Sequence, residues 1–406
     1  MPKKAAKQAG GALVAEGKTK IIRASKTHPG KVLILSKDDI TAGDGAKHDL
    51  IEGKAALATR TTCNVFRLLK ACGLPVGFEE QIDEKTFLAP QCRMLPYEVV
   101  VRREAHGSFL KRMPALRKGH FFPKLLVEFF LKTNGRKWKN HALLCDDPLM
   151  EYSAADGTIA LYEPSRPIPG QQPFLVLEAS EVFARAGEAK LFAEMSKIAR
   201  RAFLVLEKAW QLQGRTLVDF KVEFGQTAKG ALLLADVIDN DSWRVLENGV
   251  YIDKQSYRDG GRLDDVAEKY RRVAEIAGRF SLPVQQAIIW RGSDKDDVGP
   301  LVAALGRFGA GAGDRFRITT ATCSIHKEPG RGLDELHRLV QQVPDSVVIA
   351  FIGRSNGAGP TLSASTTVPV ITVPASFKDF PEDVWSSLRT PSNVPVTTVL
   401  EPANAA

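Results

Sequence analysis

Hydrophobic and polar residues change their spacing several times along this chain, and each change predicts a different element. Residues 13–60 contain short apolar runs separated by glycine turns, including LVAEGKTKIIRA and KVLILS, which predicts a β-rich start. PYEVVVRR predicts a further strand, and TLVDFKVEFG and GALLLADVID predict two strands that pair through the turn QTAKG. Residues 178–214 carry apolar side chains at helical spacing and end in glycine, so we expect a helix there.

The pattern changes again near residue 283. Apolar residues from Leu263 to Phe280 recur at steps of three and four, which predicts one amphipathic helix before the proline of SLPVQQ. Beyond it the strand patterns QAIIW, RFRITTAT, SVVIAFIG and VPVITVP alternate with helical ones, which is typical of a parallel sheet with helices on both faces. We therefore expect two domains, 13–282 and 283–406, and a surface hairpin or lobe at residues 153–173.

Composition narrows the class of protein. Of the 406 residues, 44% are hydrophobic and 25% are charged, which are ordinary values for globular domains. No apolar run approaches the roughly 20 residues of a membrane span and no signal peptide opens the chain, so we expect a cytoplasmic protein without a membrane partner. The five scattered cysteines suit reduced thiols, and residues 1–12 predict a disordered basic tail.

The charge balance points to anionic partners. The chain has 56 basic and 47 acidic residues, a net charge of +9. Because the basic residues are dispersed and no zinc-finger or RNA-binding signature is present, we expect small phosphorylated molecules rather than nucleic acid.

Two glycine-containing motifs near the start allow a ligand to approach the backbone closely. EGKTK places Lys18 and Lys20 beside Gly17, where ammonium groups and amides can cover phosphates, although an ordinary Gly-Lys turn is the alternative. DDITAGDGAKHD offers Asp44 between glycines, where a carboxylate can bind a hydroxyl or a cation. A plain acidic loop is the alternative for that motif.

Cations gather in the segment VVVRREAHGSFLKR. Arg102, Arg103, Lys111 and Arg112 surround the dipeptide at 107–108. Like charges repel one another unless they share anions, so this segment predicts a carboxylate or phosphate site.

The segments VDFKVEFG and LLLADVIDNDSWR are the richest in candidate chemistry. Lys221 and Glu223 alternate along one face of a predicted strand, and Asp236 ends the next strand. Pairing of these strands would bring Glu223 and Asp236 together as oxygen ligands for Mg²⁺ and a nucleoside triphosphate, with a structural salt-bridge network as the alternative. Three cations that follow can hold a second substrate: Arg244, Lys254 and Arg258.

About residues 13–260 resemble the SAICAR synthetase family (phosphoribosylaminoimidazole-succinocarboxamide synthetases) of purine biosynthesis. The matching motifs are EGKTK, DDITAGDG, PQCRMLPYEVVVRR, GSFLKR, LVDFKVEFG, ADVIDNDSWR and DKQSYRD. They are nearest the animal type, in which this ligase is fused to a carboxylase. The resemblance implies a two-lobed α+β fold related to ATP-grasp proteins. It also implies ATP- and Mg²⁺-dependent ligation of carboxyaminoimidazole ribotide (CAIR) with L-aspartate to give SAICAR, ADP and phosphate.

The resemblance also implies roles for individual residues. For ATP these are Lys18, Lys20, Met94, Glu223 and Asp236, with Glu223 and Asp236 as the metal ligands. For CAIR they are Arg102, Ser108, Arg244, Lys254 and Arg258, with Asp44 and Lys221 as the catalytic residues. Glu104 and His106 depart from the small or apolar residues that are commoner at these positions of the family.

The second half resembles the aminoimidazole ribotide (AIR) carboxylase family through IIWRGSDKDD, SIHKEP, GRSNGAGPTLS and DVWSSLRTPS. That resemblance implies a flavodoxin-like α/β/α three-layer domain with a parallel sheet, and the reaction of AIR with CO₂ to give CAIR. It implies that His326 handles the proton at the carbon that receives CO₂. The implied AIR- and CAIR-binding residues are Ser293, Asp296, Ser324, Lys327, Arg354, Ser355, Asn356 and Gly357. Ordinary helix-capping roles are the alternative for Ser293 and Asp296.

Two departures from the carboxylase pattern bear on activity. Lys295 stands where the family usually has serine, and the sequence ends at VLEPANAA, where the family continues with a helix that packs on the domain and its neighbours. We expect a domain that folds, exposes apolar sheet surface and has weak or no carboxylase activity. A truncated chain, a degenerate domain kept for assembly and an active domain with altered packing remain open. For the whole chain we expect a homo-oligomer, with a small-molecule kinase or a scaffold as alternative functions.

Overall fold

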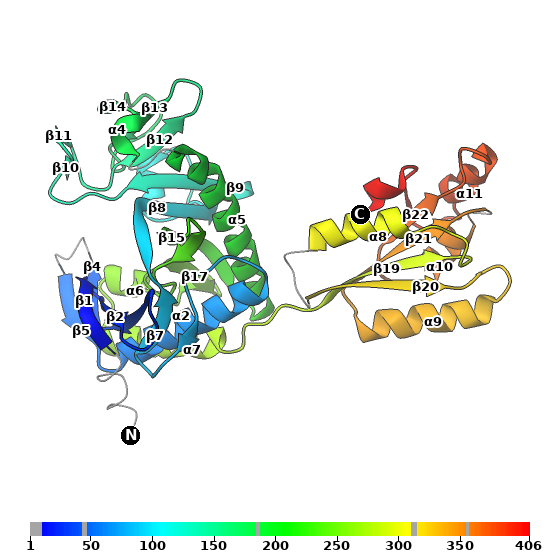
Figure 1. Cartoon of the computed structure of the whole chain (residues 1–406), viewed down its shortest axis with the longest axis horizontal. Helices are drawn as coiled ribbons and strands as arrows, with labels where there is room; N and C mark the ends of the chain where they lie inside the picture. The colour runs from blue at the N-terminus through cyan, green and yellow to red at the C-terminus, as the bar shows by residue number, and fades with distance from the viewer. Residues whose placement is uncertain (1–9, 43–46, 184–186, 310–314, 355–356) are drawn as a thin grey trace. The chain divides into compact units, whose positions relative to one another are not determined.

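The computed structural model describes residues 10–42, 47–183, 187–309, 315–354 and 357–406 of the chain (Figure 1). They form two compact units, which we call the first and the second unit. The first unit runs to Ser281 and the second begins at Leu282, except that Ala71–Gly73 group with the second unit.

The first unit opens with a five-stranded antiparallel sheet in the order β1-β2-β3-β7-β6. Its strands are β1 (Gly10–Glu16), β2 (Lys20–Ser25), β3 (Lys31–Ser36), β6 (Glu80–Gln81) and β7 (Thr86–Pro90). The predicted strand–turn–strand of EGKTK is therefore confirmed. β4 (Asp39–Ala42) and β5 (Lys47–Leu50) form a separate pair.

Helix α2 (Lys54–Ala71) corrects the prediction that residues 13–60 are β-rich throughout. Its buried residues recur at helical steps, and Phe66 packs against Phe78 and Phe87 with ring centroids 6.0 and 6.4 Å away. The small sheet therefore acquires its hydrophobic core from a helix whose threonine-rich sequence conceals the periodicity.

A nine-stranded antiparallel sheet forms the second lobe of this unit, in the order β14-β13-β12-β9-β8-β15-β17-β18 with β16 paired to β15. Its strands are β8 (Cys92–Glu104), β9 (Phe121–Leu131), β12 (Leu149–Ser153), β13 (Thr158–Tyr162), β14 (Leu175–Glu178), β15 (Thr216–Thr227), β16 (Leu232–Ala235), β17 (Trp243–Glu247) and β18 (Val250–Tyr251). The long strands β8 and β15 lie side by side at its centre (Figure 1).

One face of this sheet is covered by α5 (Glu188–Leu212), where Phe203 meets Phe220 of β15 at 5.4 Å. The expected helix over 178–214 is in fact two, because α4 (Ala179–Val182) ends before Gly187 begins α5 with a φ of 85°. Helix α7 (Leu263–Ala277) is confirmed near its predicted position. Shorter elements of the unit are α3 (Phe109–Arg112), β10 (Lys137–Trp138), β11 (His141–Ala142) and α6 (Gln255–Arg258).

Residues 153–173, expected as a surface hairpin or lobe, belong partly to the large sheet. β12 and β13 form a hairpin that pairs with β9 on one side and β14 on the other. The chain between β13 and β14 then returns to α3, where the Ile168 N–H donates to the Arg112 carbonyl at 2.9 Å. The segment therefore widens the sheet and adds a covering layer over α3.

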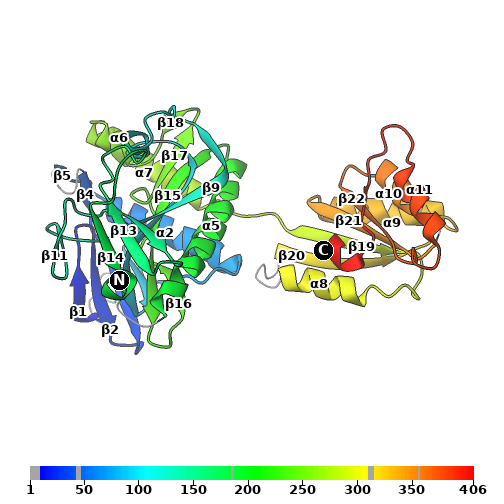
Figure 2. The ribbon, with the colours of Figure 1, turned by 90° about the horizontal axis from the view of Figure 1, so that it is seen from above.

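The second unit is a three-layer α/β/α domain, as expected. Its five parallel strands lie in the order β20-β19-β21-β22-β23. They are β19 (Gln285–Arg291), β20 (Phe316–Thr322), β21 (Ser346–Ile352), β22 (Val370–Pro374) and β23 (Thr397–Thr398). Figure 2 labels β19, β20, β21 and β22 of this sheet. The helices are α8 (Gly299–Gly309), α9 (Pro329–Gln342), α10 (Ala358–Ala364), η3 (Pro381–Val384), α11 (Trp385–Leu388) and η4 (Pro402–Ala405).

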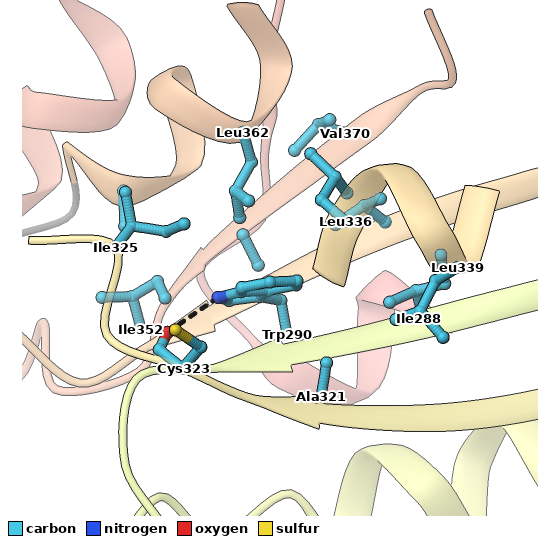
Figure 3. Packing of buried hydrophobic residues seen from close by; sticks show 13 residues of the cluster. Ile288, Trp290, Ala321, Cys323, Ile325, Leu336, Leu339, Ile352, Leu362 and Val370 are labelled. Carbon is cyan, nitrogen blue, oxygen red and sulfur yellow. Dashed lines mark hydrogen bonds between the residues drawn. The ribbon is translucent and has the colours of Figure 1, made fainter. Parts of the chain in front are cut away.

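Alternating strand residues build a separate core on each face of this parallel sheet. Trp290 packs with Leu336 of α9 and Leu362 of α10, and its Nε1–H donates to the Cys323 carbonyl at 3.0 Å (Figure 3). On the other face, Ile289 packs with Leu301 of α8. This alternation is the physical reason that both faces of the sheet carry helices.

The expected exposure of apolar sheet surface was wrong for the described residues. The large apolar side chains that this unit exposes are all outside the strands: Phe308, Phe380, Trp385, Leu388 and Leu400. Ala405 of η4 is 6% exposed and packs in the core on the α8 side of the sheet. Among the described residues of the whole chain, no helix is long and apolar enough to cross a membrane.

Candidate active site

The strand β15 carries the candidate chemistry on one face. Asp219, Lys221, Glu223 and Gly225 alternate with the buried residues that pack toward α5, so the four share the opposite face. Across from them on β8, Arg102 pairs with Asp219 and Met94 pairs with Gly225. Two cavities open along this face, one at each end of the row.

The first cavity measures about 300 Å³ and lies between the small sheet and the end of β15. Its walls are mostly apolar and include Val14, Ala15, Ile22, Val32, Ile34, Ala89, Pro90, Cys92, Met94 and Ala235. Four charged side chains face it: Lys20, Lys132, Glu223 and Asp236. Met94 is 41% exposed, which leaves an apolar surface open to a flat ligand. We call this the nucleotide cavity, after the ligand that the family resemblance implies for its residues.

Gly225 keeps the nucleotide cavity open where β8 and β15 approach. A Cβ atom there would lie 2.6 Å from the Cys92 Cβ and 3.1 Å from the Met94 Sδ. The pairing of the two strands shifts its register between Glu223 and Gly225. The glycine therefore allows Met94 to lie beside the strand without displacing it.

The charges of the nucleotide cavity form two ion pairs. Glu223 lies beside Ala235 in the strand pairing, and Asp236 follows immediately with a φ of +65°, an uncommon backbone for a residue other than glycine. Lys20 pairs with Asp236, and the Lys132 Nζ lies 2.7 Å from a Glu223 oxygen. Burial lowers the pKa of Lys20 to about 8, so its ammonium would gain from an additional anionic partner.

The carboxylates of this cavity fit a cation that arrives with a ligand. Among the described residues, no group of three or more His, Cys, Asp or Glu side chains could hold a metal ion by itself. Glu223 and Asp236 supply hard oxygen atoms of the kind that Mg²⁺ prefers, but two carboxylates are too few for a closed site. The remaining ligands would come from phosphate oxygens and water.

The second cavity measures about 210 Å³ and is strongly polar. Its charged lining residues are Glu98, Arg102, Asp219, Lys221, Asp241, Arg244 and Arg258, together with the hydroxyls of Ser108 and Ser242. Lys221 pairs with Glu98 at 2.7 Å. Burial alone would lower the pKa of Lys221, but Glu98 and Glu223 outweigh it and the pKa is raised, so this ammonium stays charged. We call this the anion cavity.

The guanidinium groups of the anion cavity are fixed by a buried series of alternating charges. Asp219 accepts from Arg102 at 2.8 Å and from Arg244 at 2.8 and 3.0 Å. Arg102 also donates to Glu128 at 2.6 Å, and Arg112 donates to the other Glu128 oxygen at 2.7 Å. Each guanidinium is thereby neutralised in part and held in one orientation. A further anion would complete the charge balance at the open end of the series.

Lys254 does not line the anion cavity, although the sequence placed it with the CAIR-binding residues. It is 7% exposed and donates to Asp241 at 2.9 Å, behind the cavity wall. Asp241 also accepts from the hydroxyl of Tyr270. Burial would raise the pKa of Asp241, but Lys54, Lys254 and Tyr270 together hold it below its usual range. Lys254 therefore acts on the cavity through Asp241.

Four more of the predicted residues lie elsewhere or outside the described chain. Lys18 is exposed in the turn between β1 and β2 and does not line the nucleotide cavity. Asp44, Ser355 and Asn356 lie outside the described residues. The remaining predicted residues of the first unit line one of its two cavities.

Sequence reasoning missed several residues that the structure brings to the site. Asp219 is two positions before Lys221, so strand alternation alone could have placed it on the same face. Glu98 and Glu128 come from strands β8 and β9, and Lys132 directly follows β9. No local pattern distinguishes these three from surface charges. Their role depends on strand pairing between distant segments.

In the second unit, candidate residues meet where the parallel strands end. The loop after β19 approaches the loop after β21, because a Cβ atom on Gly353 would lie 2.9 Å from the Asp296 Oδ1. The loop after β20 approaches as well, since a Cβ atom on Gly357 would lie 3.6 Å from His326. These loops occupy the carboxyl edge of the sheet, where open α/β sheets bind ligands.

The individual side chains of this edge are mostly exposed. The Ser293 N–H donates to Asp296 Oδ2 at 3.0 Å, which fits the turn-stabilising alternative as well as a ligand site. The Ser324 carbonyl accepts from the Lys327 N–H at 3.1 Å. Arg354 stacks on Phe380, with its guanidinium carbon 3.9 Å from the ring centroid.

Two cavities lie along one face of β15: one is mostly apolar and has paired carboxylates, and the other is rich in guanidinium groups. This arrangement suits an enzyme that binds two anionic substrates side by side. The family described as SAICAR synthetase matches residues 13–147 and 176–276, and the family described as AIR carboxylase matches residues 293–406. The chain therefore belongs to both families, with the SAICAR synthetase match before the AIR carboxylase match.

Similar proteins agree with this assignment. A bifunctional phosphoribosylaminoimidazole carboxylase/phosphoribosylaminoimidazole succinocarboxamide synthetase of Homo sapiens is 37% identical over 413 residues, covering 96% of this chain and 87% of that protein. A phosphoribosylaminoimidazole-succinocarboxamide synthase of Chloroflexus aurantiacus is 41% identical over 278 residues, covering 66% of this chain and 97% of that protein. Among solved structures, a SAICAR synthetase in complex with ADP aligns with a TM-score of 0.52 and 26% identity, covering 67% of this chain and all of that one.

Proposed function

We propose that the first unit ligates CAIR with L-aspartate at the expense of ATP, giving SAICAR, ADP and phosphate, as a step of purine biosynthesis. One observation carries this proposal: Lys221 and Glu223 share one face of β15 but line different cavities. Residues two apart on a strand are separated by about 7 Å. Reacting ends of ligands in the two cavities would therefore meet above this pair.

ATP fits the nucleotide cavity. Its adenine would lie against Met94, and Lys20 and Lys132 would neutralise its phosphates. Glu223 and Asp236 would hold Mg²⁺ together with phosphate oxygens, and the ion would spread the negative charge that develops on them. The ion pairs that now join these lysines and carboxylates would then separate, each group gaining a ligand partner.

CAIR fits the anion cavity because it carries a phosphate and a carboxylate. Arg102, Arg244 and Arg258 would bind these anions with the hydroxyl of Ser108, and Asp219 would keep the two neighbouring guanidiniums in place. Lys221, at the boundary of the cavities, would hold the carboxylate that reacts.

The chemistry then requires positioning and charge neutralisation. A CAIR carboxylate oxygen attacks the γ-phosphorus of ATP, the bond to ADP breaks, and the activated carboxyl carbon becomes open to attack. The amine of L-aspartate forms the new C–N bond, phosphate leaves with the transferred oxygen, and the amine loses a proton. Lys221 and the guanidinium groups reduce the charge repulsion that separates these anions, which is the main barrier that a protein can lower here.

The decisive experiment measures ADP release by the purified full chain with CAIR and L-aspartate supplied separately and together. We expect release only when both are present. ADP release that needs CAIR but not aspartate would indicate the small-molecule kinase instead. No release under either condition would overturn the proposal.

For the second unit we propose a site of the AIR carboxylase type, in which His326 would hold the proton that leaves the carbon that receives CO₂. Weak or absent turnover stays our prediction, and Lys295, exposed in the loop after β19, is the departure that motivates it. Bicarbonate-dependent conversion of AIR to CAIR by the full chain tests this prediction, and turnover at a rate like that of the ligase step would overturn it. A cytoplasmic location and a homo-oligomer complete the proposal, and light scattering of the purified chain checks the oligomer.

A further inference from the structure

The loop between β8 and α3 contains a histidine that the proposed chemistry does not use. His106 is 3% exposed, with Nε2 3.0 Å from a Glu104 oxygen and Nδ1 2.6 Å from the hydroxyl of Tyr251. The two rings meet edge to face, with centroids 5.8 Å apart at 82°. His106 therefore ties this loop to β18, a strand from a distant part of the sequence.

The proton arrangement of these three side chains follows from their chemistry. A neutral imidazole has one donor and one acceptor nitrogen, and the Glu104 carboxylate only accepts. Nε2 must then carry the proton, and Nδ1 accepts from the O–H of Tyr251. Burial raises the pKa of Tyr251 to about 12, which keeps that hydroxyl protonated, and burial lowers the pKa of His106.

The residues that follow His106 belong to the anion cavity. Gly107 has a φ of +58°, and a Cβ atom on it would lie 2.4 Å from the Arg244 Nη2, so the loop backbone lies directly against that guanidinium. Ser108 lines the same cavity. Phe109 comes next and packs its ring under Arg102, at 5.2 Å from the guanidinium carbon. A displacement of this loop would therefore move three sides of the anion cavity.

We propose that His106 is a positioning residue that holds the Gly107–Ser108 backbone against Arg244 through its hydrogen bonds to Glu104 and Tyr251, and so sets the shape of the anion cavity. The inference rests on the proposed function, because it assigns a role in binding CAIR. It also accounts for the joint departure of positions 104 and 106 from the small or apolar residues that are commoner in the family, since the two side chains are hydrogen-bond partners.

The charges around His106 decide how the contact responds to pH. Glu104 and Asp219 favour the imidazolium, whereas burial and Lys118 disfavour it. Lys118 lies 4.9 Å from the centre of the Tyr251 ring, and Arg244 lies on the far side of the loop. Protonation of Nδ1 would remove the acceptor for the Tyr251 O–H, so acid should loosen the loop.

The first test replaces the imidazole in the full-length chain. His106→Leu should raise the KM for CAIR about tenfold, the change that loss of one buried hydrogen bond produces, with the KM for ATP unchanged within about twofold. His106→Gln should restore most of the affinity, because its amide can donate to Glu104 and accept from Tyr251. His141→Leu is the matched control, since His141 pairs with Glu181 at 3.1 Å on the separate β10–β11 hairpin.

The second test changes the partner and reads the proton directly. Tyr251→Phe keeps the ring packing and removes only the hydroxyl, so we expect a smaller increase in the KM for CAIR. Nitrogen NMR of the ligand-free chain should show the His106 proton on Nε2 in the wild type and a mixture of tautomers in Tyr251→Phe. The loss of CAIR affinity at acid pH that depends on His106 should be absent from His106→Gln.

The outcomes separate this inference from the function on which it rests. An unchanged KM for CAIR in both His106→Leu and Tyr251→Phe would overturn the positioning role while leaving the ligase intact. A proton on Nδ1 in the ligand-free wild type would also overturn it, whatever the activity. Failure of the wild-type chain to bind CAIR in calorimetry would instead overturn the proposed function.

Discussion

The two units hold their candidate residues in opposite ways. In the first unit, Arg102 is 3% exposed and projects from the middle of a sheet, between carboxylates on both neighbouring strands. In the second unit, the Arg354 side chain is 68% exposed and lies in a loop beyond a strand end. In the first unit, a substitution of a site residue should therefore also change the stability of the fold. In the second unit, site residues can be substituted with little effect on stability.

This difference has an energetic reason. Buried charges are costly unless each is paired and hydrogen-bonded, so the series from Arg112 to Arg244 must be complete for any member to be tolerated. Exposed groups stay hydrated and need no such network. A charge-removing substitution in the first unit should therefore destabilise several neighbouring charged residues. In the second unit it should affect only the substituted residue and its direct contacts.

The largest expected effect comes from a matched pair of glutamate substitutions. Glu128→Gln removes the charge between Arg102 and Arg112 and should lower the free energy of unfolding by about 3–5 kcal/mol, the cost of breaking a buried pair. Glu335→Gln makes the same change in an exposed pair with Arg338 on α9 and should cost less than about 1 kcal/mol. Urea unfolding of both variants measures these losses. Equal losses of unfolding free energy would contradict the claim that the first unit depends on its charge pairs more than the second unit does.

The next effect is a pH dependence that belongs to the first unit. Asp253 is fully buried, and burial raises its pKa to about 6 although it accepts two backbone N–H groups at 2.7 Å. Between its unfolded value of 3.8 and this folded value, the native chain holds a proton that the unfolded chain releases. Stability from this group is therefore present below pH 4 and is lost as pH rises to about 6, by at most about 3 kcal/mol.

Asp253→Asn should remove that dependence. The difference in unfolding free energy between the variant and the wild type should move in favour of the variant as the pH rises from 4 to 7. Chemical denaturation at several pH values measures it, and two parallel curves would show that Asp253 is not the titrating group.

A somewhat smaller effect is expected on catalysis. Arg244→Ala removes a charge-assisted contact to CAIR worth about 1.5–3 kcal/mol, so kcat/KM for CAIR should fall about 10- to 150-fold. Arg338→Ala in the second unit should leave the ligase rate unchanged. Steady-state kinetics with saturating ATP and aspartate compare the two variants. An unchanged kcat/KM for CAIR in Arg244→Ala would show that this residue does not bind CAIR.

The smallest effect concerns the stacked arginine of the second unit. Arg354→Ala removes a guanidinium that stacks on Phe380 near the surface, a contact worth about 0.5–1 kcal/mol. Arg389→Ala, which removes the similar stacking on Trp385 at 4.6 Å, should give a comparable loss. A loss of several kcal/mol in thermal unfolding would mean that this loop is as strongly coupled to its fold as the sheet of the first unit.

Much of this architecture could be predicted because the relevant patterns are local. Periodicity within a few residues predicts the alternation of Lys221 and Glu223, and it predicts four of the five parallel strands of the second unit. Helix α2 was missed because Lys54 and three threonines are among its eleven buried residues, so its buried side is not continuously apolar. Glu128 and Lys132 were missed for a different reason: they matter only because β9 and the residues after it lie beside β8, which is a long-range pairing that no local pattern encodes.

The placement of both cavities on β15 links correct folding to correct chemistry. Side chains on a strand point alternately to opposite faces, so a slip of one position against β8 would turn Asp219, Lys221 and Glu223 into the apolar layer under α5. The same slip would expose the phenylalanines that normally fill that layer. A molecule with this defect would bind neither substrate. The specific activity of a preparation should therefore be proportional to the fraction of molecules in which β15 pairs with β8 in the correct register.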